Sequence, residues 1–281
     1  MVIKELLQYG SKLLSDSGAH TPQLDASLLL CHALKKDRSY LIINHTQNVQ
    51  ENDEKAFISL LKKRADGMPI AYIVGKKEFM SLEFDVNENV LIPRADTETL
   101  CEYIIDNNDK KSPKIADICC GSGAIGVSLA FYIKDSHVTM ADISEEALKT
   151  AQTNAKKHSV YERCSFEKID ILSENLKEKY DIIVSNPPYI ESDVIDTLER
   201  DVKDFEPRLA LDGGEDGFVF YTHLSKACYN MLNSGGVLAF EVGHTQAQAV
   251  EKMLLDNGFC DVKSVCDLAN IKRVVCAVKR I

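Results

Sequence analysis

Apolar residues recur at helical spacing through the first 66 residues of the chain. A first helix ends at Gly18, a second begins at Thr21-Pro22, and a third spans about residues 52–66 with Gly67 past its end. The apolar faces are formed by Ile3, Leu6, Leu7, Leu13 and Leu14, then by Leu24, Leu28 and Cys31, and then by Phe57, Leu60 and Leu61. The pattern predicts a small all-helical unit.

From Ala71 the pattern changes to a partial alternation of apolar and polar residues. The alternating apolar positions are Phe79, Leu82, Phe84 and Val86, and residues 90–92 form a short apolar run. We interpret these segments as two strands of a hairpin-like connector that ends at Pro93.

After Pro93, short apolar runs alternate with helical patterns. Helices are predicted at residues 145–157 and 245–257, and strands at 114–119, 137–142, 165–169, 181–185, 237–242, 262–266 and 274–278. Repeated strand–helix units predict an α/β fold with a doubly wound, mostly parallel seven-stranded, Rossmann-like sheet. The last two strands follow each other directly, which predicts an antiparallel pair at the sheet edge. The predicted domains are 1–70 (helical), 71–93 (β-hairpin linker) and 94–281 (sheet).

Composition is typical of a soluble globular protein, with 45% hydrophobic and 27% charged residues. We see neither a secretory signal nor an apolar run long enough to span a membrane. The nine cysteines form no CxxC pair, and Cys119 and Cys120 are adjacent, which suits neither an ordinary disulfide nor a metal site. We interpret the cysteines as small buried hydrophobic residues of a reducing, cytoplasmic protein.

Charge is unevenly distributed along the chain. Residues 1–80 carry 11 Lys and Arg against 9 Asp and Glu, whereas the remainder carries 22 against 34. Phosphate binding is mostly an effect of Lys and Arg. The acidic main body therefore argues against direct binding of a nucleic-acid duplex.

A glycine-rich turn follows the strand predicted at 114–119. The turn, which we call the glycine loop, is Gly121-Ser122-Gly123-Ala124-Ile125-Gly126, and Asp142 ends the next strand, where a carboxylate can accept both hydroxyls of a ribose. The loop alone allows a dinucleotide or S-adenosylmethionine (SAM) as cofactor. With SAM, Asp117 can help to hold the amino-acid part of the cofactor. Asp170 can meet the adenine amine or be a surface residue.

The strand predicted at 181–185 ends in Asn186-Pro187-Pro188-Tyr189, which we call the NPPY corner. Its prolines fix φ and donate no hydrogen bond, which leaves an amide side chain, bare carbonyls and one ring. Such a corner suits a planar –NH2 group, because oxygens accept its two N–H bonds and the ring packs on its face. A hydride-transfer enzyme has no use for it, so the corner favours SAM.

Further short motifs extend along nearly the whole chain. They are Asp-Ala-Ser-Leu-Leu at 25–29, Arg64, Gly-Met-Pro-Ile-Ala-Tyr-Ile at 67–73, Glu-Phe at 78–79, Leu-Ile-Pro-Arg-Ala-Asp-Thr-Glu at 91–98, Phe-Glu-Pro at 205–207, Gly-Gly at 235–236 and Glu-Val-Gly at 241–243. With the glycine loop and the NPPY corner, they make the chain similar to class I SAM-dependent methyltransferases. Within that class it resembles the PrmC/HemK family, which methylates a glutamine side-chain amide in peptide chain release factors.

The resemblance implies a protein-(glutamine-N5) methyltransferase of translation termination that acts on the Gly-Gly-Gln loop of release factors. SAM, left as S-adenosylhomocysteine after transfer, would contact Asp117, Cys119, Cys120, Gly121, Ser122, Gly123, Asp142, Asp170, Ile171 and Asn186. The catalytic residues would be Asn186, Pro187 and Tyr189, and the substrate would meet Asn186, Pro187, Pro188 and Tyr189. No metal is implied, and the helical unit would dock the protein substrate.

The chain departs from the family pattern at two places. Ala95 stands where the family usually has Pro, and Cys119-Cys120 stand where it usually has Gly-Thr. The second change puts side-chain bulk at the cofactor, so that bulk must point away or cofactor affinity suffers. Arg94 is either a charge near the site or a brace for the connector, and we favour the brace.

Three other functions compete with this interpretation. An adenine-N6 methyltransferase of DNA or RNA could use the same corner on a flipped base, but the acidic body opposes it. A non-catalytic SAM-binding regulator is disfavoured by the intact corner. An NAD-dependent oxidoreductase rests on the glycine loop alone.

Overall fold

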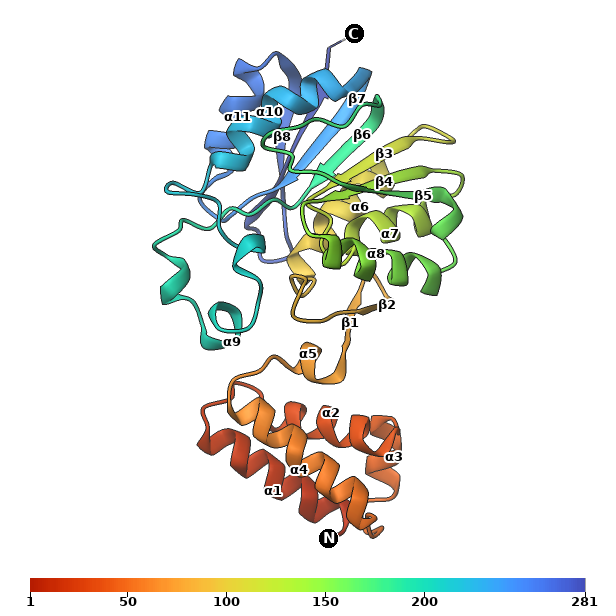
Figure 1. Ribbon diagram of the computed structural model, residues 1–281, viewed down its shortest axis with the longest axis vertical. Coiled ribbons are helices and arrows are strands. Elements are labelled where there is room, and N and C mark those ends of the chain that lie inside the picture. The colour runs from red at the N-terminus through yellow and green to blue at the C-terminus, as the bar shows by residue number, and fades with distance from the viewer. Residues whose placement is uncertain (281) are drawn as a thin grey trace. The chain divides into compact units, whose positions relative to one another are not determined.

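The computed structural model describes residues 1–280 and divides into two compact units (Figure 1). The first unit comprises Met1–Lys76 and Glu199–Phe205, and the second comprises Lys77–Leu198 and the chain from Glu206 on. The final residue of the predicted domain 94–281 lies outside the described residues.

The first unit is helical. Over Met1–Lys76, all of which the structure describes, its helices are α1 (Ile3–Asp16), α2 (Pro22–Leu34), α3 (Arg38–Ile43), α4 (Glu51–Ala65) and α5 (Ile70–Val74). The predicted stops are confirmed, because Gly18 and Gly67 follow α1 and α4 with positive φ. The short helices α3 and α5 were not predicted. A further short helix, α9 (Arg200–Lys203), lies in the segment 199–205.

The apolar face predicted for the second helix is wrong. Leu24 is 41% exposed, whereas Ala26, Leu29 and Leu30 of α2 are fully buried against α1 and α4. The sequence of α2 is apolar around most of its circumference, so periodicity alone does not identify its inner face.

A buried ion pair ties α2 to α4. Asp25 accepts hydrogen bonds from Arg64 Nε at 2.8 Å and from the Thr21 hydroxyl at 2.7 Å, and Arg64 also donates to the Met68 carbonyl. The side chains of Asp25 and Arg64 are only 5% and 11% exposed. Each charge would be costly without the other, because both have left water.

The connector contains a tight hairpin formed by β1 (Lys76–Phe79) and β2 (Leu82–Asp85). Met80 and Ser81 join the strands with φ of 50° and 56°, the backbone of a two-residue turn that matches strand twist. Residues 90–92, which the structure describes in full, form no strand, so the strand predicted there is wrong. The Ile92 N–H donates to the Glu206 carboxylate instead of to a neighbouring strand.

The second unit contains the predicted seven-stranded sheet, in the order β5-β4-β3-β6-β7-β9-β8. Its strands are β3 (Lys114–Ile118), β4 (His137–Asp142), β5 (Cys164–Lys168), β6 (Tyr180–Ser185), β7 (Leu232–Glu241), β8 (Phe259–Cys266) and β9 (Lys272–Lys279). β3 to β7 pair in parallel, whereas β9 runs antiparallel to β7 and β8. The antiparallel pair predicted at the edge is therefore confirmed.

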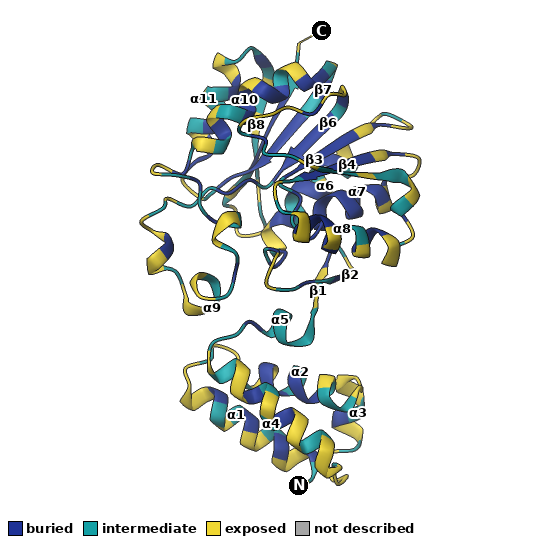
Figure 2. Cartoon of the chain, in the orientation of Figure 1, coloured by how far each residue is buried: buried dark blue, intermediate teal, exposed yellow. Residues whose placement is uncertain are grey.

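Helices cover both faces of this sheet (Figure 1). The helices are α6 (Glu98–Asn107), α7 (Ala124–Tyr132), α8 (Glu145–Lys157), α10 (Val219–Met231) and α11 (Ala247–Asp256). Along β3, Ile115 packs with α6, α7 and α8, whereas the next residue, Ala116, packs with α10 and α11. Figure 2 shows the central strands β3, β4, β6 and β7 as mostly buried and the outer helix faces as exposed.

Within residues 1–280, no helix is both long and apolar enough to cross a membrane. The same residues hold all nine cysteines, and each carries a free thiol. Four of them are buried, but Cys266 is exposed, so the interpretation of the cysteines as buried hydrophobic residues holds only in part.

Candidate functional site

A cavity of about 400 Å³ lies at the carboxyl ends of β3, β4, β5 and β6. Register explains why these ends meet, because Ile118 of β3 pairs with Ala141 of β4 and with Ser185 of β6. The predicted residues that line the cavity are Cys119, Cys120, Gly121, Ser122, Asp142, Asp170, Ile171, Asn186 and Pro188. The wall formed by the described residues does not include Asp117, Gly123, Pro187 or Tyr189.

Asp142 is held at the cavity by backbone donors. The N–H groups of Gly121 and Ser144 donate to its two carboxylate oxygens, each at 2.9 Å. Burial raises the pKa of Asp142, and these backbone hydrogen bonds oppose the rise. Because a carboxylate oxygen accepts about two hydrogen bonds, each oxygen keeps one position for a ligand hydroxyl.

Asp170 stabilises the turn after β5. Its Oδ1 accepts from the Leu172 N–H at 3.0 Å and its Oδ2 from the Ser173 hydroxyl at 3.0 Å. Asp170, Ile171 and Leu172 all line the cavity. Asp170 therefore belongs to a turn that forms part of the cavity wall, and its contact with an adenine amine stays a prediction.

Asp117 lies beneath the glycine loop. It is fully buried, its Oδ2 accepts the Gly126 N–H at 2.8 Å, and its Oδ1 has no hydrogen-bond partner among residues 1–280. Burial raises the pKa of Asp117 to about 7. Asp117 thus holds the start of α7 in this structure.

Backbone conformation at the glycine loop explains why position 123 is a glycine. It also bears on the departure from the family pattern at Cys119. Gly123 has φ of 77°, and a Cβ there would lie 2.9 Å from the Cβ of Ala151. Cys119 has φ of 60°, a left-handed conformation that favours glycine and costs other residues roughly 1 kcal/mol. Its side chain packs against core residues of the α10 and α11 face, close to Ser185, and Cys119 also lines the cavity.

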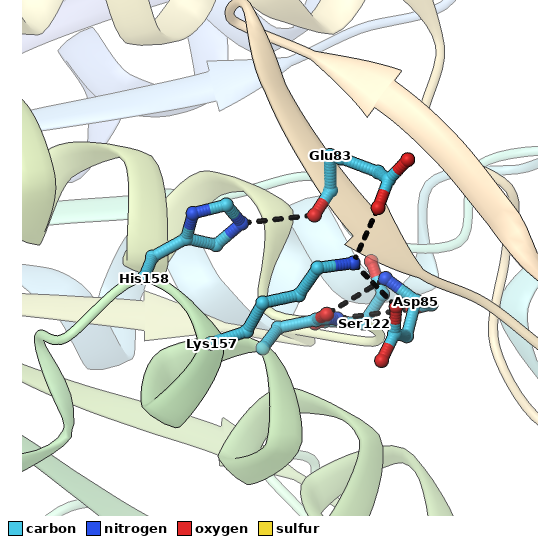
Figure 3. Close-up of polar contacts among 6 residues, drawn as sticks. Glu83, Asp85, Ser122, Lys157 and His158 are labelled. Atoms are coloured by element: carbon cyan, nitrogen blue, oxygen red, sulfur yellow. Dashed lines mark hydrogen bonds and ion pairs between the residues drawn. The ribbon is translucent and has the colours of Figure 1, made fainter. Parts of the chain in front are cut away.

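Asn154 of α8 ties the glycine loop to the hairpin. Its Nδ2 donates to the carbonyls of Ser122 and Asp85, and its Oδ1 accepts the Asp85 N–H at 2.7 Å. Lys157, one turn later, contacts the carboxylates of Glu83 and Asp85 (Figure 3). The loop is therefore tied to both α8 and the hairpin.

The NPPY corner is in contact with two residues that the sequence analysis did not assign to the site. Asn186 Nδ2 donates to Thr97 Oγ1 at 3.4 Å, and the Tyr189 hydroxyl donates to Glu241 Oε1 at 3.4 Å. Thr97 and Glu241 are 4% and 3% exposed. Thr97 belongs to the 91–98 motif, and Glu241 ends β7.

The carboxyl group of Glu241 has an unusually high pKa. Burial raises its pKa to about 7, opposed by the hydroxyls of Thr97 and Tyr189 and by the charge of Arg273, while Asp96 adds to the rise. Its Oε2 has no hydrogen-bond partner within the described chain. The sequence marked Glu241 as part of a motif, but no local signal indicated its burial.

The pKa of Glu241 predicts a pH-dependent stability. The unfolded carboxyl ionises near its ordinary value of 4.5 and the folded one near 7, so wild-type stability falls as pH rises through this window. In Glu241→Gln this loss, about 3 kcal/mol, should disappear. The raised pKa of Asp117 leaves Glu241→Gln with a residual fall in stability as pH rises. Urea unfolding of wild type and Glu241→Gln at pH 5, 6, 7 and 8 measures how steeply the stability of each protein falls with pH. Identical slopes in the two proteins would contradict the raised pKa of Glu241.

The backbone of Tyr189 is held by Gln246 and lies close to Gly213. Gln246 Nε2 donates to the carbonyls of Tyr189 and Gly217, and its Oε1 accepts the Gly243 N–H. A Cβ on Gly213 would lie 2.7 Å from the Cα of Tyr189. The corner is therefore packed against main-chain atoms, which cannot move aside as the end of a flexible side chain could.

We expect Gly213→Ala to lower kcat of the methyl transfer that the sequence predicts by ~10-fold, because the added methyl must displace Tyr189 and with it the corner. The affinity for the predicted cofactor, SAM, should stay within about twofold, because Gly213 does not line the cavity. Steady-state kinetics and calorimetric titration measure the two effects. An unchanged kcat would show that the corner tolerates the shift.

Arg94 both lines the cavity and forms an ion pair. Its guanidinium contacts Glu206 Oε1 at 2.5 Å, and Glu206 Oε2 accepts the Ile92 N–H. The Glu206 side chain is only 2% exposed, whereas Arg94 is 39% exposed. The bracing contact favoured from sequence is present, and the same arginine reaches the cavity.

Comparisons with known proteins agree with this architecture. Residues 5–75 match the PrmC N-terminal domain, and residues 95–225 match the Methyltransferase small domain. A methyltransferase structure from Pyrococcus furiosus has the same fold, with a TM-score of 0.54 at 18% identity over 73% of this chain and 92% of that one.

Two relatives match almost the whole chain. The release factor glutamine methyltransferase of Clostridium botulinum is 42% identical over 282 residues, which is 99% of this chain and 100% of the relative. That of Clostridium acetobutylicum is 41% identical over 285 residues, 99% of each. On this similarity, the chain belongs to the family of release factor glutamine methyltransferases.

Proposed function

We propose that this enzyme transfers a methyl group from SAM to the N5 amide nitrogen of the glutamine in the Gly-Gly-Gln loop of peptide chain release factors. The carrying observation is an amide corner, Asn186 and Pro188, in the wall of the same cavity as Asp142. The names of the 42% and 41% identical relatives support the substrate class. Such a substrate places the reaction in the cytoplasm.

The cavity suits the chemistry of SAM. Asp142 keeps free acceptor positions for ribose hydroxyls, and the carbonyl and carboxylate groups after β5 can meet an adenine amine. Asp117 has an oxygen without a hydrogen-bond partner among residues 1–280 but does not line the cavity, so its contact with the amino group of the cofactor stays a prediction. When bound, SAM supplies an electrophilic methyl group on a sulfonium.

The work of the protein would be to orient an amide nitrogen, which is a weak nucleophile because its lone pair is delocalised. In the observed orientation Asn186 donates from Nδ2 to Thr97, which leaves Oδ1 as an acceptor for the substrate. A second N–H would bind the Pro187 carbonyl, and the Tyr189 ring would pack on the amide. Both oxygens favour the positive charge that develops on nitrogen, and they align it for in-line transfer. Pro187 and Tyr189 do not line the cavity formed by the described residues, so these two contacts stay predictions.

Labelled SAM and a purified class I release factor test this function directly. Label should enter the release factor and should be absent from a copy whose Gly-Gly-Gln glutamine is replaced by alanine. Label on both proteins would place the methyl group elsewhere. Label on neither, with SAM binding intact, would reject the release factor as substrate, and label on an adenine-containing oligonucleotide would establish the competing adenine-N6 activity.

A further inference from the structure

One leucine of the second unit stands entirely in solvent. Leu268 has a relative exposure of 109%, the highest of any large hydrophobic residue among residues 1–280. It belongs to the turn at residues 267–271, which joins β8 to β9 and which we call the β8–β9 tip. Single exposed leucines are common on protein surfaces and need no explanation by themselves. The place and the support of this tip are what distinguish Leu268.

Strand register places the β8–β9 tip at the edge of the sheet that holds the cavity. β8 ends at Cys266, which pairs with Lys272, the first residue of β9. Two residues further along β9, Val274 pairs with Glu241, the last residue of β7. Because β7 runs parallel to β6, their carboxyl ends lie at the same edge. The tip therefore lies at the edge where the NPPY corner follows β6.

The tip is held in one shape by Asp267, whose side chain is only 5% exposed. Its Oδ1 accepts the N–H groups of Ala269 and Ile271, each at 2.9 Å. The Asp267 N–H donates to the Ile271 carbonyl at 2.9 Å, and Asn270 has φ of 61°, a conformation that asparagine tolerates. These bonds fix the backbone on both sides of Leu268. A loop that is ordered before binding loses less conformational entropy on association.

Two ion pairs connect the tip to the wall of the cavity. Arg273 contacts Asp267 Oδ2 through Nε and Asp96 Oδ2 through Nη2, each at 2.9 Å. The Arg273 side chain is 20% exposed, so salt screens these pairs less than it would screen pairs in open solvent. Asp96 directly precedes Thr97, which lines the cavity. The tip and the cavity wall are therefore parts of one connected structure.

The proposed substrate segment offers little for an enzyme to hold. In a Gly-Gly-Gln loop, two residues have no side chain, and the third must place its amide in the corner. The hydrogen bonds made there replace hydrogen bonds to water, so their net gain is small. Burial of apolar surface is the dominant favourable term in most protein association. Affinity for the protein substrate therefore has to come from apolar contacts outside the loop.

We propose that Leu268 is an anchor for the protein substrate and inserts into an apolar depression on the release factor beside its Gly-Gly-Gln loop. The identity of the partner rests on the proposed function. The occupant is the methyl-accepting protein because the tip is tied to the wall of the cavity that would receive the glutamine. The anchor touches no reacting atom, so it acts on binding and not on the chemical step.

The test compares Leu268→Ala and Leu268→Met, with Leu255→Ala as the matched control. Leu255 is 56% exposed near the end of α11, shortly before β8 begins, and thus at the opposite edge of the sheet. Leu268→Ala should raise the KM for a class I release factor ~10-fold and leave kcat within about twofold, because apolar surface alone is lost. Leu268→Met keeps the apolar bulk, so its KM should stay within about threefold of wild type. The Kd for SAM and the Tm should not change in any variant, because both leucines are exposed.

A wild-type KM in Leu268→Ala, or an equal rise in Leu255→Ala, would overturn the anchor and leave the proposed function intact. Calorimetric titration with the release factor, in the presence of S-adenosylhomocysteine, separates the two proposals. If the wild-type enzyme binds the release factor without methylating it, the proposed function fails, and a ~10-fold weaker binding by Leu268→Ala still supports the anchor. If the wild-type enzyme does not bind it, or if Leu268→Ala changes only self-association of the enzyme, the anchor is wrong.

Discussion

We expect Asn186→Ala to lose about 10²–10³ in kcat, the usual effect of removing one such oriented contact. The substitution deletes the side-chain oxygen that would accept a substrate N–H, and no neighbouring side chain of the corner offers the same group. The Kd for SAM should change little, because Asn186 forms only part of the cavity wall. Single-turnover transfer from labelled SAM to a release factor measures the chemical step, and calorimetry measures the binding step.

Asn230→Ala is the matched control, since this asparagine is exposed on α10 and its side chain donates to the Lys226 carbonyl one turn earlier. Its kcat should equal that of wild type. If Asn186→Ala transferred the methyl group at the wild-type rate, orientation by this amide would be wrong. If it lost SAM binding to the same degree as turnover, the residue would belong to the cofactor site rather than to the substrate corner.

We expect Asp25→Ala to destabilise the helical unit by about 3–5 kcal/mol, because it leaves the Arg64 guanidinium buried without its partner. The affinity for SAM should be retained, since all cavity residues belong to the second unit. If the helical unit docks the release factor, as we propose, the KM for that protein should rise once the unit unfolds. In calorimetric unfolding, the helical unit should unfold at a lower temperature than in wild type.

Asp66→Ala serves as the control, because Asp66 is exposed just after α4. It should leave both the unfolding profile and KM unchanged. Unfolding of the helical unit with an unchanged KM would remove its role in docking. A parallel loss of SAM affinity would show that the second unit does not fold without it.

The strand pattern of the sheet was predictable because parallel strands buried on both faces form short, continuous apolar runs. The hairpin was harder, since its turn consists of Met80 and Ser81 and contains no Gly, Asn or Asp, the residues that favour positive φ at such a turn. In the apolar run at 90–92, Val90 and Ile92 are buried, but the Ile92 N–H bonds a side chain, which no periodicity can indicate. In α2, a nearly uniform apolar composition concealed the inner face.

The site likewise contains some residues that were predictable from the sequence and others that were not. Residues directly after strand ends, such as Asp142 and Asn186, were predictable because the carboxyl ends of parallel strands meet at one edge. The residues that hold them were not. Asn154, Gln246 and Thr97 contact partners 69, 57 and 89 positions away in sequence, so no local pattern identifies them.

The position of β9 between β7 and β8 has a consequence for how the protein is made. Both β7 and β8 are translated before β9, and each has β9 as a neighbour in the finished sheet. On the ribosome, the edge of β7 therefore stays unpaired until Lys272–Lys279 has emerged. Such an edge can pair with other chains. The sheet that carries Glu241 is thus completed only late in synthesis, when its last strand enters between two strands already made.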